Sequence, residues 1–133
     1  MSGFPAKYCR VVASRVEGDD AYVLLDTGPE GHPYLYGVNC SRGDGSWHDD
    51  GSGNTPCWAQ SGPDILLGTL VIWGEAPVDA EMVRFSFEGT TTEEPVSNGV
   101  YLAAWWRTPS PEGSWPRVEA FRIRDVWIHG SFR

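Results

Sequence analysis

The densest group of chemically active side chains lies in a glycine-rich segment, where Asp44 is followed by His48, Asp49 and Asp50. Carboxylates on such a segment can bind Ca²⁺ through their hard oxygen atoms. The glycine and the distant glutamate of an EF-hand loop are missing, and no closely spaced Cys or His pair of the zinc-binding kind occurs. We therefore expect no cofactor and no bound metal, with a Ca²⁺ site as the alternative to a solvated acidic segment.

Hydrolase chemistry would draw on the same segment. A Ser-His-Asp triad would need Ser46 or Ser52 together with His48 or His129, and the Gly-x-Ser-x-Gly turn of many hydrolases is absent. A triad is defined by its geometry and not by sequence spacing, so a small hydrolase using His48 stays open as an alternative. Our leading expectation is a protein without enzymatic activity.

Tryptophan is abundant, with seven residues among 133. Exposed indole rings stack on sugars and anchor protein interfaces, whereas buried ones close the ends of a core. Trp105 and Trp106 are neighbours on one predicted strand, so their rings should point to opposite faces. The candidate binding residues are Trp47, His48, Asp49, Asp50, Trp58, Trp105 and Trp115.

The three cysteines are Cys9, Cys40 and Cys57. A disulfide between Cys40 and Cys57 would close the glycine-rich segment and stabilise the fold by ~3 kcal/mol. The N-terminus has no basic region followed by an apolar one, so we expect a cytoplasmic protein. Reduced thiols are then favoured over the disulfide, which stays open as the alternative.

Strand-like patterns fill most of the chain. The clearest is at residues 82–87, where Val83, Phe85 and Phe87 alternate with less apolar residues, as in a half-buried strand. Further runs occur at residues 8–16, 21–26, 34–40, 66–73, 90–96, 100–107, 118–124 and 126–128. Eight or nine short strands separated by turn residues, with no long helical repeat, predict an all-β sandwich.

Two features predict how strands in the second half are arranged. Pro95 cannot donate to a ladder, so residues 90–96 should form an edge strand or a strand with a bulge. Asn98-Gly99 predicts a type I′ hairpin turn. The expected register pairs Ser97 with Val100, Val96 with Tyr101 and Pro95 with Leu102.

Residues 41–64 differ from the strands around them, because they are rich in glycine and show no periodicity. A segment of this length without regular structure is usually functional or disordered, and its aromatic residues argue against disorder. We expect a long ordered loop over about residues 41–64, held in place by Trp47 and Trp58. In the strand before it, Gly37 indicates a bulge or a close backbone approach.

The formal charge is −8, which opposes binding to phosphate backbones and favours a basic protein partner. No run approaches the ~20 apolar residues of a membrane-spanning helix, so we expect no membrane partner. A chain of 133 residues suits one domain with a core of its own.

The second half of the chain carries a family resemblance. The segment Ala-Glu-Met-Val-Arg-Phe-Ser-Phe-Glu-Gly at residues 80–89 is followed by Glu-Pro-Val-Ser-Asn-Gly-Val-Tyr-Leu-Ala-Ala-Trp-Trp at residues 94–106. This order resembles immunoglobulin-like domains of uncharacterised bacterial proteins, in which a strand of the Val-Arg-Val-x-Phe-x-Gly kind precedes a short strand, an Asn-Gly turn and an aromatic strand. Residues 120–125 fit the closing hairpin. The resemblance implies an immunoglobulin-like sandwich and brings no catalytic residues.

These observations predict a single-domain, immunoglobulin-like β-sandwich with a long glycine-rich loop. The function that we expect is a non-enzymatic module that docks a protein partner through an acidic, Trp-bearing surface, as an immunity or inhibitor protein would. The alternatives are a carbohydrate-binding module that stacks sugars on its indole rings, and the small hydrolase described above.

Overall fold

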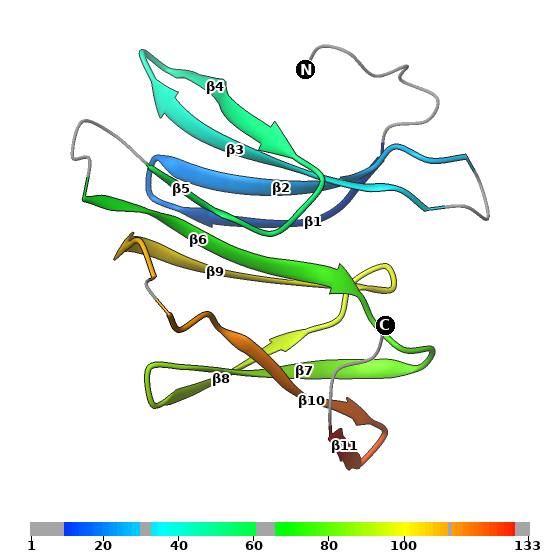
Figure 1. Ribbon diagram of the computed structural model, residues 1–133. Helices are drawn as coiled ribbons and strands as arrows, with labels where there is room; N and C mark the ends of the chain where they lie inside the picture. The colour runs from blue at the N-terminus through cyan, green and yellow to red at the C-terminus, as the bar shows by residue number, and fades with distance from the viewer. Residues whose placement is uncertain (1–9, 30–32, 61–65, 112, 130–133) are drawn as a thin grey trace.

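The protein is built of β-strands and turns (Figure 1). The structure is a computed structural model that describes residues 10–29, 33–60, 66–111 and 113–129. In these ranges no helix is long and apolar enough to cross a membrane. The strands are β1 (Arg10–Glu17), β2 (Asp20–Asp26), β3 (Leu35–Gly43), β4 (Ser46–Gly53), β5 (Trp58–Gln60), β6 (Leu67–Glu75), β7 (Ala80–Phe87), β8 (Thr90–Pro95), β9 (Val100–Pro109), β10 (Arg117–Ile123) and β11 (Val126–His129).

The strands form three antiparallel sheets that stack on one another (Figure 1). The N-terminal sheet has the order β1-β2-β3-β4, the middle sheet β5-β6-β9, and the C-terminal sheet β11-β10-β7-β8. The predicted all-β sandwich is confirmed, with three layers in place of the usual two. An immunoglobulin-type arrangement of the strands stays a prediction.

Both faces of the middle sheet are covered, so the molecule has two cores. In the first core Tyr22 and Leu24 of the N-terminal sheet join a cluster with Leu102 of β9. In the second, Phe85 of the C-terminal sheet joins a cluster with Ala103, the next residue of β9. Successive strand side chains point to opposite faces, and β9 therefore supplies both cores in alternation. Trp106 faces the first core and Trp105 the second, as predicted.

The Asn98-Gly99 turn is confirmed, with φ values of 54° and 77° and a bridge between Ser97 and Val100. The register predicted beyond that bridge is wrong. Val96 donates its backbone N–H to Glu81, β8 pairs with β7, and β9 pairs with β6. The strands separate because β9 is apolar on both faces and needs cover on both, whereas polar β8 remains at a sheet edge. The prediction of an edge strand at residues 90–96 is confirmed.

The expectation of a long loop at residues 41–64 is wrong. Asp44 and Gly45, with φ values of 55° and 78°, form a tight turn that joins β3 to β4, and β5 follows. An Asp-Gly pair is a favoured hairpin turn. The strand β4 escaped prediction because its side chains are exposed on both faces, so no apolar alternation marks it. The end of the predicted loop, residues 61–64, lies outside the described residues.

At Gly37 the backbone lies close to another side chain, which confirms the second of the two predicted roles, a bulge or a close backbone approach. A Cβ atom at this position would lie 1.9 Å from the Tyr22 hydroxyl oxygen. That oxygen accepts a hydrogen bond of 3.0 Å from Trp73 Nε1, which joins the N-terminal sheet to the middle sheet. Burial raises the pKa of Tyr22 to about 12. The ring of Tyr22 therefore occupies the space that any side chain at residue 37 would need.

The outer edge of the middle sheet is formed by β9. Two side-chain contacts beside β9 connect β1 to β8 and to the turn before β9. Arg15 of β1 forms an ion pair of 3.1 Å with Glu94 of β8, and so joins the two outer sheets. Asn98, just before β9, donates from its side chain to the backbone oxygen of Val12 at 2.9 Å.

Candidate binding surfaces at one end of the stacked sheets

Two turns meet at one end of the N-terminal sheet, on the left in Figure 1. The backbone N–H of Arg42 donates to the backbone oxygen of Asp19 at 2.7 Å, and the Arg42 guanidinium pairs with the Asp19 carboxylate at 3.1 Å. We call this region the acidic end. Its charged residues are Glu17, Asp19, Asp20, Asp44, Asp49 and Asp50, together with Arg42.

Trp47 lies on β4 directly opposite Arg42 of β3. The guanidinium of Arg42 stands 5.1 Å from the centre of the indole ring, as in a cation–π contact. This contact and the Asp19 ion pair orient the ring on the sheet. The Trp47 residue nevertheless stays 45% exposed, so the acidic end presents an ordered aromatic surface.

The open edge of β4 is poorly suited to pairing with another strand. A register shift leaves Asp50 as an extra residue, since Cys40 pairs with Asp49 and Asn39 with Gly51. The Asp49 carboxylate also accepts the backbone N–H of Gly51 at 2.9 Å. Bulges and edge carboxylates discourage strand addition. The acidic end thus offers side chains rather than a backbone ladder.

His48 lies on the opposite face of β4 from Trp47, and its Nε2 is 3.4 Å from the backbone oxygen of Gly43. Ser52 donates its hydroxyl to Tyr36 at 3.3 Å. Over the described ranges, no group of three or more His, Cys, Asp and Glu residues is placed to hold a metal ion. These contacts provide no support for the hydrolase alternative.

Two of the predicted binding residues pack inside the fold. Trp58 is half-buried and donates its Nε1–H to the backbone oxygen of Thr108 at 2.8 Å. Trp105 is also half-buried, and its ring meets Phe85 and Phe87 edge-on at 6.0 and 5.5 Å between centroids. The structure therefore does not unite the candidate tryptophans on one platform, because Trp58 and Trp105 serve packing.

The cysteines Cys40 and Cys57 are free thiols, so the disulfide considered as an alternative is not formed. Burial raises the pKa of both thiols, and the carboxylates of Asp49 and Asp50 raise that of Cys40 further. Cys9 lies outside the described residues.

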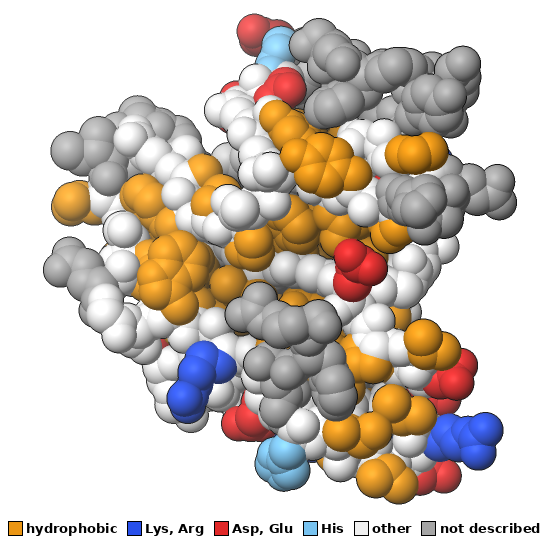
Figure 2. Space-filling view, turned by 45° about the vertical axis from the view of Figure 1, so that its right-hand side comes forward, with side chains coloured by type: hydrophobic (Ala, Val, Ile, Leu, Met, Phe, Trp, Pro, Cys, Tyr) orange, Lys and Arg blue, Asp and Glu red, His pale blue; other side chains and the backbone are white. Residues whose placement is uncertain are grey.

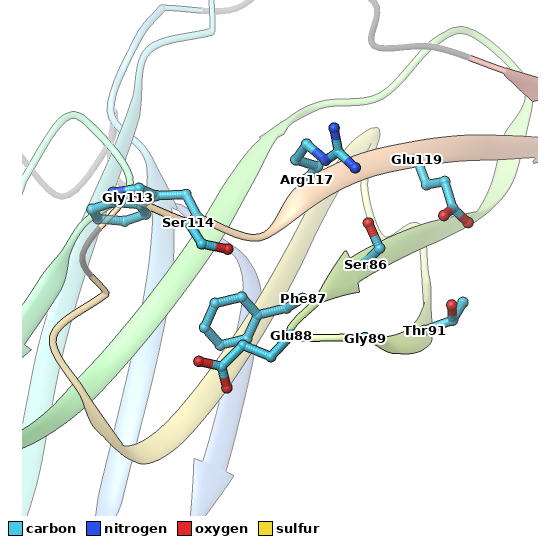
Figure 3. Close-up of a pocket in the computed structure, with 10 residues that line it drawn as sticks. Ser86, Phe87, Glu88, Gly89, Thr91, Gly113, Ser114, Arg117 and Glu119 are labelled. Carbon is cyan, nitrogen blue, oxygen red and sulfur yellow. The ribbon is translucent and has the colours of Figure 1, made fainter.

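Beside the β7–β8 turn lies a groove of about 700 Å³ that the sequence patterns did not indicate. It forms where strands separate: β10 pairs with β7 only as far as Arg117 and Ser86, whereas β7 and β8 remain paired to Phe87 and Thr90. Pro116 has no N–H with which to continue the ladder. We call this the end groove. Its lining includes Ser86, Phe87, Glu88, Thr91, Ser114, Trp115, Arg117 and Glu119 (Figure 3).

The acidic character of the N-terminal sheet is visible on the molecular surface. Figure 2 shows acidic side chains at the top of the molecule, at the height of the N-terminal sheet, and further ones in its middle and lower parts, where the visible Lys and Arg side chains also lie. Hydrophobic side chains gather across the middle of the same face.

No protein-family model, curated protein or solved structure matches this chain. Its function must therefore be argued from its own residues and their geometry.

Proposed function

We propose that this protein is a binding module that docks a basic protein partner on its acidic end. The observation that carries the proposal is the half-exposed Trp47 ring, held by Arg42 where carboxylates gather. An aromatic anchor within a charged rim is the common arrangement of energetically important interface residues.

Charge selects the partner. The described residues that we assign to the acidic end include six acidic side chains and Arg42, which pairs with Asp19. The whole chain adds to this local excess with its formal charge of −8. Such a surface accelerates encounters with basic proteins and repels acidic ones.

Pre-organisation supports a role for Trp47 as the anchor. Ordering a flexible side chain on binding costs about 0.5–1.5 kcal/mol. Here the indole ring already lies against Arg42, which is in turn fixed to the β1–β2 turn by Asp19. Docking would bury the exposed part of the ring with little further loss of freedom. A small acidic inhibitor or immunity protein would use such a surface.

The test is a selection from a displayed random-peptide library on the wild-type protein, followed by affinity measurements on single peptides. We expect Lys- and Arg-rich peptides that bind more weakly as salt rises. Trp47→Ala should weaken them at least about tenfold, as expected for a hot-spot residue.

The matched control is Trp127→Ala, because the Trp127 ring also carries an arginine, Arg84, at 3.8 Å from its centre, but belongs to the C-terminal sheet. This variant should bind the peptides as the wild type does, with folding of both variants checked by circular dichroism. Peptides without a basic excess, or equal losses in the two variants, would contradict the proposal.

A further inference from the structure

We infer that the end groove is a second binding site, which takes a neutral carbohydrate. It differs from the acidic end in position and in ligand class, since it lies on the C-terminal sheet and the loop before β10. The two proposals can therefore fail separately.

The groove combines aromatic surface with a polar lining. The Trp115 residue is 45% exposed. Phe87, which also lines the groove, is buried with its ring against Trp105. Ser86, Arg117 and Glu119 lie across neighbouring strands, and Ser114 enters from the loop (Figure 3). The indole of Trp115 is thus the accessible aromatic ring of the groove, whereas the ring of Phe87 belongs to the second core.

The lining supplies both donors and acceptors. Hydroxyls come from Ser86, Thr91 and Ser114, while carboxylates of Glu88 and Glu119 accept and the Arg117 guanidinium donates. A sugar ring matches this set, because its hydroxyls both donate and accept and its C–H face packs on an aromatic ring. The described lining holds two carboxylates, of which that of Glu119 pairs with Arg84 at 3.9 Å, and one guanidinium, so it has no positive excess to attract anionic ligands such as nucleotides.

The backbone of Glu88 allows the stability of this turn and its role in binding to be tested separately. Glu88 and Gly89 have φ values of 52° and 77°, nearly those of the Asn98-Gly99 turn at 54° and 77°. Asparagine tolerates this left-handed conformation, whereas glutamate is strained in it. Five other described non-glycine residues, Arg124 among them, also have positive φ values, so it is the place of Glu88 in the groove lining that selects it. Glu88 is one of the residues that line the groove, and we assign its carboxylate the role of a sugar-hydroxyl acceptor.

This assignment predicts opposite effects on stability and on binding. Glu88→Asn converts the turn to Asn-Gly, so the melting temperature should rise by a few degrees. The same variant should lose at least about tenfold in saccharide affinity, as should Trp115→Ala. The probes are neutral gluco-, manno-, xylo- and galacto-oligosaccharides, each titrated by calorimetry up to about 10 mM.

The matched control is Arg124→Asn in the β10–β11 turn, where Arg124 also has a positive φ, of 59°, and does not line the groove. It should stabilise the protein without changing saccharide affinity, and Trp47→Ala should leave saccharide affinity unchanged. Absence of binding by every oligosaccharide would overturn the inference and leave the proposal for the acidic end standing. Binding that survives both Glu88→Asn and Trp115→Ala would also overturn it.

Discussion

Replacing Gly37 by alanine should be among the most damaging single-methyl changes in this protein. The new Cβ would lie 1.9 Å from the hydroxyl oxygen of Tyr22 and 2.5 Å from Cζ of its ring. To restore van der Waals separation the hydroxyl must move by about 1.5 Å, which breaks its 3.0 Å hydrogen bond from Trp73. Overpacking costs about 1–3 kcal/mol and the buried hydrogen bond about 1 kcal/mol. We expect Gly37→Ala to lower the free energy of unfolding by about 2–4 kcal/mol.

Urea denaturation followed by tryptophan fluorescence measures this change, and Gly43→Ala is the control. Gly43 lies on the same strand, and a Cβ added there would meet no atom within 4 Å, so its variant should stay within about 0.5 kcal/mol of the wild type. Tyr22→Phe removes the atom in closest contact. The double variant Gly37→Ala/Tyr22→Phe should therefore lose less stability than the two single variants together. Equal stability of the two glycine variants, or strict additivity with Tyr22→Phe, would refute the reasoning.

Three further predictions concern buried polar groups. Burial alone would raise the pKa of Asp26, but hydrogen bonds from two backbone amides and from Arg10 outweigh it and hold the pKa below its ordinary 3.8. The Asp26 carboxylate therefore stabilises the fold at pH values above 3.8, and this stabilisation is lost as the pH falls through the lower pKa of the folded state. The difference in stability between the wild type and Asp26→Asn should therefore shrink below about pH 4, as measured by urea denaturation. Trp58→Phe removes the donor to Thr108 and should lower the free energy of unfolding by about 1 kcal/mol in the same assay, and an unchanged stability would contradict this role of the hydrogen bond. The raised pKa of Cys40 lowers its thiolate fraction at pH 8 and should make its alkylation by iodoacetamide slower than that of a free model thiol, and an equal rate would contradict the raised pKa.

Features encoded within a few residues were predictable from the sequence. The alternation at residues 82–87, the proline in β8 and the Asn-Gly pair each report a local backbone preference, and the structure contains all three elements. The close approach at Gly37 was also predictable as one of two meanings of a glycine within a strand.

Features that depend on distant partners were not predictable. The separation of β8 from β9 into different sheets depends on how both faces of β9 are covered, which a local turn signal does not report. The hairpin of β3 and β4 was missed because Asp44-Gly45 sits among other glycines and β4 lacks an apolar face.

Of the two candidate sites, one was predictable from neighbouring residues and the other depends on residues distant in the sequence. Trp47 with its neighbouring carboxylates was identifiable from composition, since exposed aromatic and acidic residues are adjacent in the chain. The end groove was not, because it results from one ladder ending at Arg117 while another continues to Thr90. The local signals available were the Glu88-Gly89 pair and Pro116, and neither alone indicates a ligand.

The ion pair between Arg15 and Glu94 has a consequence for behaviour at high concentration. Beside it runs β9, the outer strand of the middle sheet, which is rich in apolar and aromatic side chains. A strand of this kind seeds intermolecular β-aggregation when its edge is exposed. A partly exposed ion pair adds little to the free energy of unfolding. Its value here lies in keeping the outer sheets closed around that strand, so its removal would shorten the lag time of aggregation while the melting temperature stayed nearly the same.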